Sequence, residues 1–189
     1  DLQFDDAHIP GAVCITMLRA GFGSKLAWLA DPDQPIVLVG RDDDDAKQGV
    51  ELAAAVGIRD IGGYLAGGMT SWREEQRPVE AIERIAVVEL HERSQADEQI
   101  QILDVRERSE WESAHIPGSL FTPYHDIHAL PEGIDPERPV AAICASGQRS
   151  AVAAGLLQRF GAQEVLHVVE GGVPKWGRLG FPLEAPAGS

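Results

Sequence analysis

The sequence predicts an α/β protein made of two tandem copies of one fold, each a parallel sheet flanked by helices, with the first copy N-terminally incomplete. Three segments of the first half return in order in the second: AHIPG (7–11) at 114–118, IVLVG (36–40) as VAAIC (140–144), and GGMTSW (67–72) as GGVPKW (171–176). Within each half, short apolar runs alternate with helix-like stretches, which is typical of parallel sheets covered by helices. We therefore predict one domain over residues 1–80 and a second over 81–189.

Composition narrows the classes of function. Of the 189 residues, 44% are hydrophobic and 24% charged, as in chains that bury a core. A net charge of −14 disfavours nucleic acid as a partner, because nucleic-acid affinity depends on Lys and Arg neutralising phosphates. The apolar runs are too short to span a bilayer, so no membrane partner is expected. Two cysteines provide no disulfide framework and suggest a reducing, cytoplasmic location.

The first elements of the second copy follow from its apolar runs. Residues 85–97 predict an amphipathic helix, and the β-branched run at 100–105 predicts a buried strand. Ser109 is a candidate N-cap for a short helix over 109–114. A turn follows at 115–119, where proline and glycine interrupt regular structure.

The later elements of this copy repeat the order strand, loop, helix. Residues 140–143 predict a buried strand, and the stretch 150–161 predicts a helix that ends at Gly161. Residues 164–172 predict a strand that runs into a glycine turn. These elements complete the second copy.

The first copy begins late by comparison. Its residues 2–10 align with 109–117, so it has no counterpart of the strand at 100–105. A parallel sheet that lacks a central strand exposes backbone groups and apolar surface. We therefore expect sequence upstream, or another chain, to supply that strand. The polar stretch 73–81 is expected to link the two copies.

The segment CASGQRS (144–150) is the strongest candidate for chemistry. Cys144 ends a predicted buried strand, and a helix begins within a few residues. The amides of such a loop can form an anion-binding nest, reinforced by the helix N-terminus. The same field favours thiolate over thiol at Cys144, as a sulfur nucleophile requires. The alternative is a buried structural cysteine before an ordinary strand–helix turn.

Three motifs of the second copy resemble those of the rhodanese, or sulfurtransferase, family. They are DVRERSEW followed by AHIPGS (104–119), ICASGQRS (143–150) and EGGVPKW (170–176). They occur in order and cover nearly all of that copy. The resemblance implies a parallel five-stranded sheet flanked by helices, with a catalytic Cys144 in the loop after a central strand.

The resemblance also implies a reaction. The Cys144 thiolate would take the sulfane sulfur of thiosulfate or a low-molecular-weight persulfide, and the resulting persulfide would pass it to a thiol or to cyanide. No cofactor and no metal are implied. The residues expected to bind the donor and the transferred sulfur are Ala145, Ser146, Gly147, Gln148, Arg149 and Ser150.

Two other functions remain open. Cysteine phosphatases and arsenate reductases that resemble this family carry a loop one residue longer than the six residues from Cys144 to Arg149. The shorter loop suits a single sulfur better than a tetrahedral oxyanion. A docking module without catalysis is the other alternative, and the intact loop argues against it.

Four further residues are expected to support the site structurally. Asp104 and Arg106 are expected to form a buried charge pair, although Arg106 could instead reach the substrate. Glu110 and His115 are expected to hold the turn beside the loop.

The first copy lacks this chemistry. Gly40 aligns with Cys144, and the residues after it read RDDDD, which would repel a sulfur anion and are expected to form a solvated acidic loop. Cys14 is expected to be packed core. Residues 21–31, in a first copy that has no cysteine at the position of Cys144, are similar to the rhodanese part of metallo-β-lactamase-fold fusion proteins. That resemblance implies an upstream persulfide dioxygenase domain as a partner in the same chain.

Overall fold

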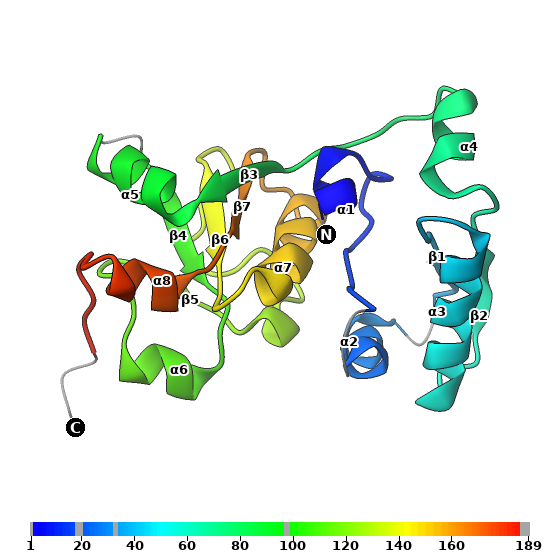
Figure 1. The fold of residues 1–189 in the computed structure, drawn as a ribbon, viewed down its shortest axis with the longest axis horizontal. Coiled ribbons are helices and arrows are strands. Elements are labelled where there is room, and N and C mark those ends of the chain that lie inside the picture. The colour runs from blue at the N-terminus through cyan, green and yellow to red at the C-terminus, as the bar shows by residue number, and fades with distance from the viewer. Residues whose placement is uncertain (1, 18–20, 32–33, 97–98, 186–189) are drawn as a thin grey trace. The chain divides into compact units, whose positions relative to one another are not determined.

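A computed structural model describes residues 2–17, 21–31, 34–96 and 99–185 of the chain. It divides into two compact units. Unit 1 comprises Asp1–Ala7, Gly11–Cys14 and Ala81–Ser189, and unit 2 comprises His8–Pro10 and Ile15–Glu80. Both units contain parallel strands and helices (Figure 1), so the predicted α/β class is confirmed.

Unit 1 is built on a parallel five-stranded sheet with strand order β3-β7-β6-β4-β5. The strands are β3 (Glu83–Ala86), β4 (Gln101–Asp104), β5 (Leu120–Phe121), β6 (Val140–Ile143) and β7 (Val165–Val169). Every residue of β4 and β6 is buried, as expected for strands covered on both faces. Strand β3 was not predicted. The strand ends at Ala86 and the next helix begins at Val87, so no turn separates them and the sequence predicted a single helix over 85–97.

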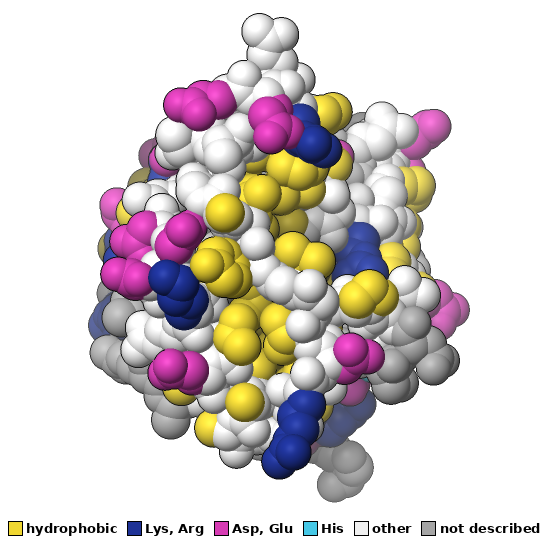
Figure 2. Space-filling model, turned by 90° about the vertical axis from the view of Figure 1, so that its right-hand side faces the viewer, with side chains coloured by type: hydrophobic (Ala, Val, Ile, Leu, Met, Phe, Trp, Pro, Cys, Tyr) yellow, Lys and Arg dark blue, Asp and Glu magenta, His cyan; other side chains and the backbone are white. Residues whose placement is uncertain are grey.

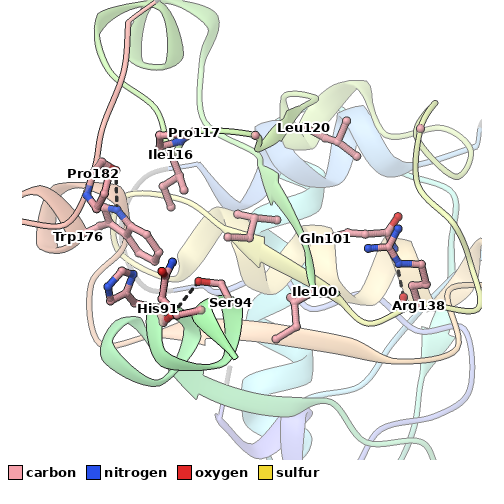
Figure 3. Close-up of a pocket in the computed structure, with 14 residues that line it drawn as sticks. His91, Ser94, Ile100, Gln101, Ile116, Pro117, Leu120, Arg138, Trp176 and Pro182 are labelled. Carbon is pink, nitrogen blue, oxygen red and sulfur yellow. Dashed lines mark hydrogen bonds between the residues drawn. The ribbon is translucent and has the colours of Figure 1, made fainter. Parts of the chain in front are cut away.

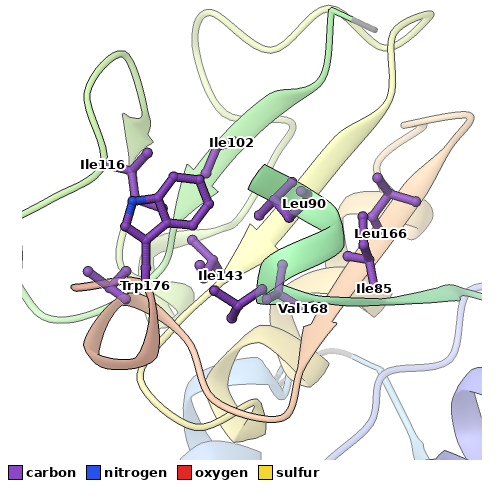
Figure 4. Close-up of a cluster of buried hydrophobic side chains, with 11 residues drawn as sticks. Ile85, Leu90, Ile102, Ile116, Ile143, Leu166, Val168 and Trp176 are labelled. Carbon is purple, nitrogen blue, oxygen red and sulfur yellow. The ribbon is translucent and has the colours of Figure 1, made fainter. Parts of the chain in front are cut away.

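Helices cover both faces of this sheet (Figure 1). α5 (Val87–Gln95) and α8 (Val173–Arg178) pack on one face, where they bury a cluster that includes Leu90, Ile143 and Trp176 (Figure 4). Because side chains alternate along a strand, Val140 and Ala142 point away from this cluster, toward α7 (Gln148–Arg159). The shorter α1 (Leu2–Asp6), α6 (Arg108–Ser113) and the 3₁₀ turn η1 (Tyr124–Asp126) complete unit 1.

Unit 2 holds a two-stranded parallel sheet of β1 (Ile36–Leu38) and β2 (Ile61–Tyr64) with α2 (Phe22–Leu29), α3 (Asp43–Ala55) and α4 (Gly68–Glu74). β1 corresponds to β6, which has neighbours on both sides, whereas among the described residues β1 pairs with β2 alone. Val37 of β1 is 61% exposed. On the face that Figure 2 shows, exposed hydrophobic side chains lie in a band down the middle. Supply of a further strand from elsewhere stays a prediction.

The acidic run of unit 2 is largely helical, which corrects the expected loop. Asp42 caps α3 by accepting a hydrogen bond from the Asp45 amide at 2.8 Å, so the other three aspartates form its first turn. Acidic side chains are favourable there because the helix N-terminus is positive. Arg41 pairs with Asp45 and lowers the pKa of that carboxyl. A Cβ on Gly40 would lie 2.5 Å from the Ala46 amide nitrogen, so the position aligned with Cys144 has no room for a side chain.

No helix in the described part of the chain is long and apolar enough to cross a membrane.

Candidate active site

Cys144 follows the central strand β6 and is 1% exposed. Its Sγ accepts a hydrogen bond from the Gly147 amide at 3.1 Å and lies 3.4 Å from the Ser150 hydroxyl. Its carbonyl accepts a hydrogen bond from the Val173 amide at 2.9 Å. The sulfur therefore sits inside the loop with one backbone donor, the Gly147 amide, already directed at it.

The loop turns into α7 at Gly147, which adopts φ 96°. This left-handed conformation is costly for residues with a Cβ, so glycine suits the position. α7 begins at Gln148, and the amides of its first turn have no acceptor within the helix. Together with the positive end of the helix, they favour negative charge on a sulfur bound beside them.

Gly172 fixes the loop from the other side. A Cβ on Gly172 would lie 1.9 Å from the Cys144 carbonyl oxygen and 2.7 Å from its carbon, so the two backbones touch directly. This contact places the turn before α8 against the residue that carries the sulfur. Of the two glycines at 171–172, the second is therefore required by packing against Cys144.

Arg149 is joined to Glu110 by a two-point ion pair. Its Nη2 donates to Glu110 Oε1 at 3.0 Å and its Nη1 donates to Oε2. The hydrogen bonds from Arg149 outweigh burial and lower the pKa of Glu110, and the same pairing raises the pKa of Arg149. At neutral pH the pair is therefore ionised, and the charge of Arg149 is largely balanced by its partner.

Asp104 and Arg106 form a buried ion pair at the end of β4, with Arg106 Nη2 2.6 Å from Asp104 Oδ2. The same Nη2 also donates to the Ala114 carbonyl at 2.7 Å, which joins β4 to the end of α6. His115 stacks on Trp111 and lies 3.4 Å from Glu184. These three residues stabilise the segments around the loop.

The N-cap of α6 differs from the expectation. Glu107, not Ser109, caps the helix, and a reciprocal capping box links Glu107 and Glu110. The helix begins at Arg108, one residue earlier than predicted.

Glu107 also accepts a hydrogen bond from His125, which pairs with Asp126. Burial disfavours the charged form of His125, but the two carboxylates outweigh it and raise its pKa.

A family model described as "Rhodanese-like domain" matches residues 1–75 and 86–179, which is most of the chain. The chain belongs to the rhodanese-like domain family. Both copies of the repeat are therefore rhodanese-like, and the confirmed fold class extends to the tandem arrangement.

Several relatives of this rhodanese-like chain carry names. A sulfurtransferase of Allochromatium vinosum is 34% identical over 52% of this chain and 92% of its own length. The thiosulfate sulfurtransferase GlpE of Pseudomonas fluorescens is 33% identical over 47% of this chain and 79% of its own. The putative sulfur carrier protein YrkF of Bacillus subtilis is 34% identical over 48% of this chain, and the chain spans about half of that relative (49%).

Among solved structures, a rhodanese-like domain protein from Staphylococcus aureus is similar to this chain. It is 28% identical, with a TM-score of 0.50, and the match covers 56% of this chain and all (100%) of that protein.

Described residues of the rhodanese-like unit 1 line two notable cavities. One of about 470 Å³ is lined by residues of α5, the 116–118 turn and Trp176 (Figure 3). None of its lining residues belongs to the 144–150 loop. The other, of about 690 Å³, is lined in part by Ser146, Gly147 and His167. The loop therefore borders a cavity on one side, although Cys144 itself does not line it.

Two residues near the loop were missed by the sequence analysis. The His167 ring is bound to the Gly147 carbonyl and to the Asp5 carboxylate, and both side chains are buried. The one available signal was a histidine inside the apolar strand VLHVV (165–169), since a buried imidazole requires hydrogen-bond partners. Asp5 carried no such signal, because it lies in a separate segment of the chain.

Proposed function

We propose that this protein is a rhodanese-type sulfurtransferase that carries sulfane sulfur on Cys144. The observation that carries the proposal is the environment of the Cys144 sulfur. It is buried at the N-terminus of α7 and accepts a hydrogen bond from the Gly147 amide. Such a site stabilises negative charge on sulfur, as an oxyanion hole does on oxygen. The sulfurtransferase names of relatives support the same reaction class.

The proposed reaction has two displacements, each balanced in atoms and charge. In the first, the Cys144 thiolate attacks the outer sulfur of thiosulfate. A new S–S bond forms, the old one breaks, and sulfite leaves with the bonding electron pair. In the second, cyanide or a thiolate attacks the outer sulfur of the Cys144 persulfide, and the Cys144 thiolate leaves. With cyanide, the product is thiocyanate.

Loop geometry favours a single sulfur over a phosphate group. Six residues join Cys144 to Arg149, and α7 begins within them at Gln148. A transferred phosphoryl group would bring three oxygens that need donors into the loop, whereas a persulfide brings a single sulfur. We therefore favour sulfur transfer over phosphate or arsenate chemistry.

Intact-mass spectrometry tests the proposal directly. The reduced protein is incubated with thiosulfate or glutathione persulfide, desalted and measured, then treated with cyanide and measured again. We expect a mass gain of one sulfur on a peptide containing Cys144, lost on cyanide treatment with release of thiocyanate. A folded, reduced sample that gains no sulfur from either donor contradicts the proposal and supports a docking role.

A second prediction concerns the charge balance of Arg149. Arg149→Ala should raise the KM for thiosulfate by roughly tenfold, since a hydrogen bond to a charged group contributes about 1.5–3 kcal/mol. Glu110→Gln should lower that KM, because it keeps the helix cap but releases the positive charge of Arg149.

A pair of matched reagents separates charge from access in these variants. Iodoacetate is anionic and iodoacetamide is neutral, and the two are nearly equal in size. The alkylation rate of Cys144 by iodoacetate, divided by its rate with iodoacetamide, should fall in Arg149→Ala and rise in Glu110→Gln. If both variants shift the ratio in the same direction, Arg149 does not attract the anionic donor.

Three expectations stay predictions. The upstream metallo-β-lactamase-fold persulfide dioxygenase is supported by none of the relatives described above. The thiol acceptor and the cytoplasmic location likewise rest on the sequence analysis alone.

A further inference from the structure

A buried chain of hydrogen bonds links the N-terminal helix α1 to the Cys144 loop. His167, in the middle of β7, is 1% exposed, and Asp5, in α1, is also 1% exposed. His167 Nδ1 lies 2.8 Å from Asp5 Oδ2, and His167 Nε2 lies 2.9 Å from the Gly147 carbonyl oxygen. The other carboxylate oxygen, Asp5 Oδ1, has no hydrogen-bond partner in the described part of the chain. The side chain of Asp5 is therefore committed to His167.

Hydrogen-bonding chemistry fixes the direction of this chain. A carbonyl oxygen only accepts, so His167 Nε2 must carry a hydrogen and donate it to Gly147. One further proton lies between His167 Nδ1 and Asp5 Oδ2, on either the ring or the carboxyl group. In both cases Asp5 holds the ring in the orientation that donates to the loop.

The Gly147 carbonyl receives two more donors, the Ala151 amide at 3.0 Å and the Ser150 hydroxyl at 3.1 Å. Both belong to α7, the helix that the loop leads into. His167 belongs to the sheet, so it is the donor that ties the loop to a fixed element. Gly147 needs such a tie, because glycine has more conformational freedom than any other residue.

Gly147 is also the residue whose amide points at the reacting sulfur. Its N–H donates to Cys144 Sγ, and its carbonyl is held by His167, so both of its peptide groups are fixed. The peptide that follows is trans, so the Gln148 N–H points opposite to the held carbonyl. The hydrogen bond that holds the Gly147 carbonyl therefore sets the directions of two backbone donors of the loop, the N–H groups of Gly147 and Gln148.

We propose that Asp5 and His167 are positioning residues for sulfur transfer, which hold Gly147 so that the loop amides meet the Cys144 persulfide. This inference rests on the proposed function. It gives the opening of the first copy a role, because Asp5 lies in residues 2–10, which align with 109–117, while the sulfur lies in the second copy. Neither residue touches the sulfur in the structure.

The test separates positioning from stability. Replacing one member of a buried polar pair leaves the other unsatisfied, whereas replacing both by apolar groups can be nearly neutral. The double variant Asp5→Leu/His167→Phe should thus unfold close to the wild-type midpoint. Its single-turnover persulfidation by thiosulfate should be about ten- to a hundredfold slower, because misplaced catalytic groups cost rates of that order. The KM for thiosulfate should change little.

Three single variants, Asp5→Ala, Asp5→Asn and Asp6→Asn, complete the series. Asp5→Asn can still donate from its amide to His167 Nδ1, so it should keep most of the rate that Asp5→Ala loses. Asp6→Asn is the matched control, since Asp6 lies on the same helix but pairs with Arg84 at the surface. It should transfer sulfur at the wild-type rate.

The outcomes distinguish the two proposals. Absence of a persulfide on the wild-type protein rejects the proposed function. Persulfidation of the folded double variant at the wild-type rate rejects the positioning role alone. If the double variant does not fold, ¹⁵N NMR of the imidazoles in the wild-type protein decides instead. A protonated, slowly exchanging Nε2 on His167 supports the tie to Gly147, and an unprotonated Nε2 overturns it.

Discussion

Replacing Cys144 by serine is expected to abolish persulfide formation and thiocyanate production. A serine hydroxyl is not ionised at neutral pH and cannot hold a sulfane sulfur, so the covalent step is lost. Rates should fall by at least about a thousandfold, since loss of a covalent nucleophile commonly costs more than that. The serine oxygen can still accept a hydrogen bond from the Gly147 amide, so the unfolding midpoint should stay near that of the wild-type protein.

The second cysteine supplies the matched control. Cys14 is also buried, and it lies outside the 144–150 loop. Cys14→Ser should therefore retain sulfur transfer and should still gain one sulfur by mass. Turnover that survives in Cys144→Ser, or that disappears in Cys14→Ser, would contradict the assignment of the nucleophile.

Gly172→Ala is expected to damage both stability and activity. The new methyl group would meet the Cys144 carbonyl at 1.9 Å, and backbone cannot rotate away as a flexible side chain can. Overpacking of this kind costs about 1–3 kcal/mol, and relief requires the loop to move away from α8. We expect a lower free energy of unfolding in urea, together with slower persulfidation of the molecules that remain folded.

Gly180→Ala is the matched control for this substitution. Gly180 has φ 78°, but no atom lies within 4 Å of the place that its new methyl group would occupy, so the change introduces backbone strain without a clash. That strain costs about 1–2 kcal/mol. Both variants should lose stability, but Gly180→Ala should keep the wild-type persulfidation rate. Equal rates in the two variants would show that contact with Gly172 does not position Cys144.

Much of the second copy could be predicted from its sequence. The strand at 140–143 is buried on both faces and therefore reads as an unbroken apolar run, and the structure assigns β6 to those residues. The helix after the loop was also predicted, although α7 begins at Gln148, two residues earlier than expected. Here local pattern and tertiary structure agree.

The interactions around the loop could not be predicted, because they join residues distant in the chain. Glu110 meets Arg149 across 39 positions, and Asp5 meets His167 across 162. Neither pair leaves a local pattern. The acidic run after Gly40 was misread for a different reason. Four aspartates suggest a solvated loop, but a helix N-terminus accepts acidic side chains in its cap and first turn.

The packing of α7 affects how this chain can be divided. A Cβ on Gly155, in the middle of the helix, would lie 3.1 Å from the Ala12 carbonyl and 3.4 Å from the Phe4 ring, so the opening residues cover this surface closely. A recombinant fragment that starts at residue 81 would contain the whole 144–150 loop and still leave that surface bare. Apolar side chains of α7 would then be exposed to water, which favours aggregation. A gene fragment for the second copy must therefore also encode the opening residues.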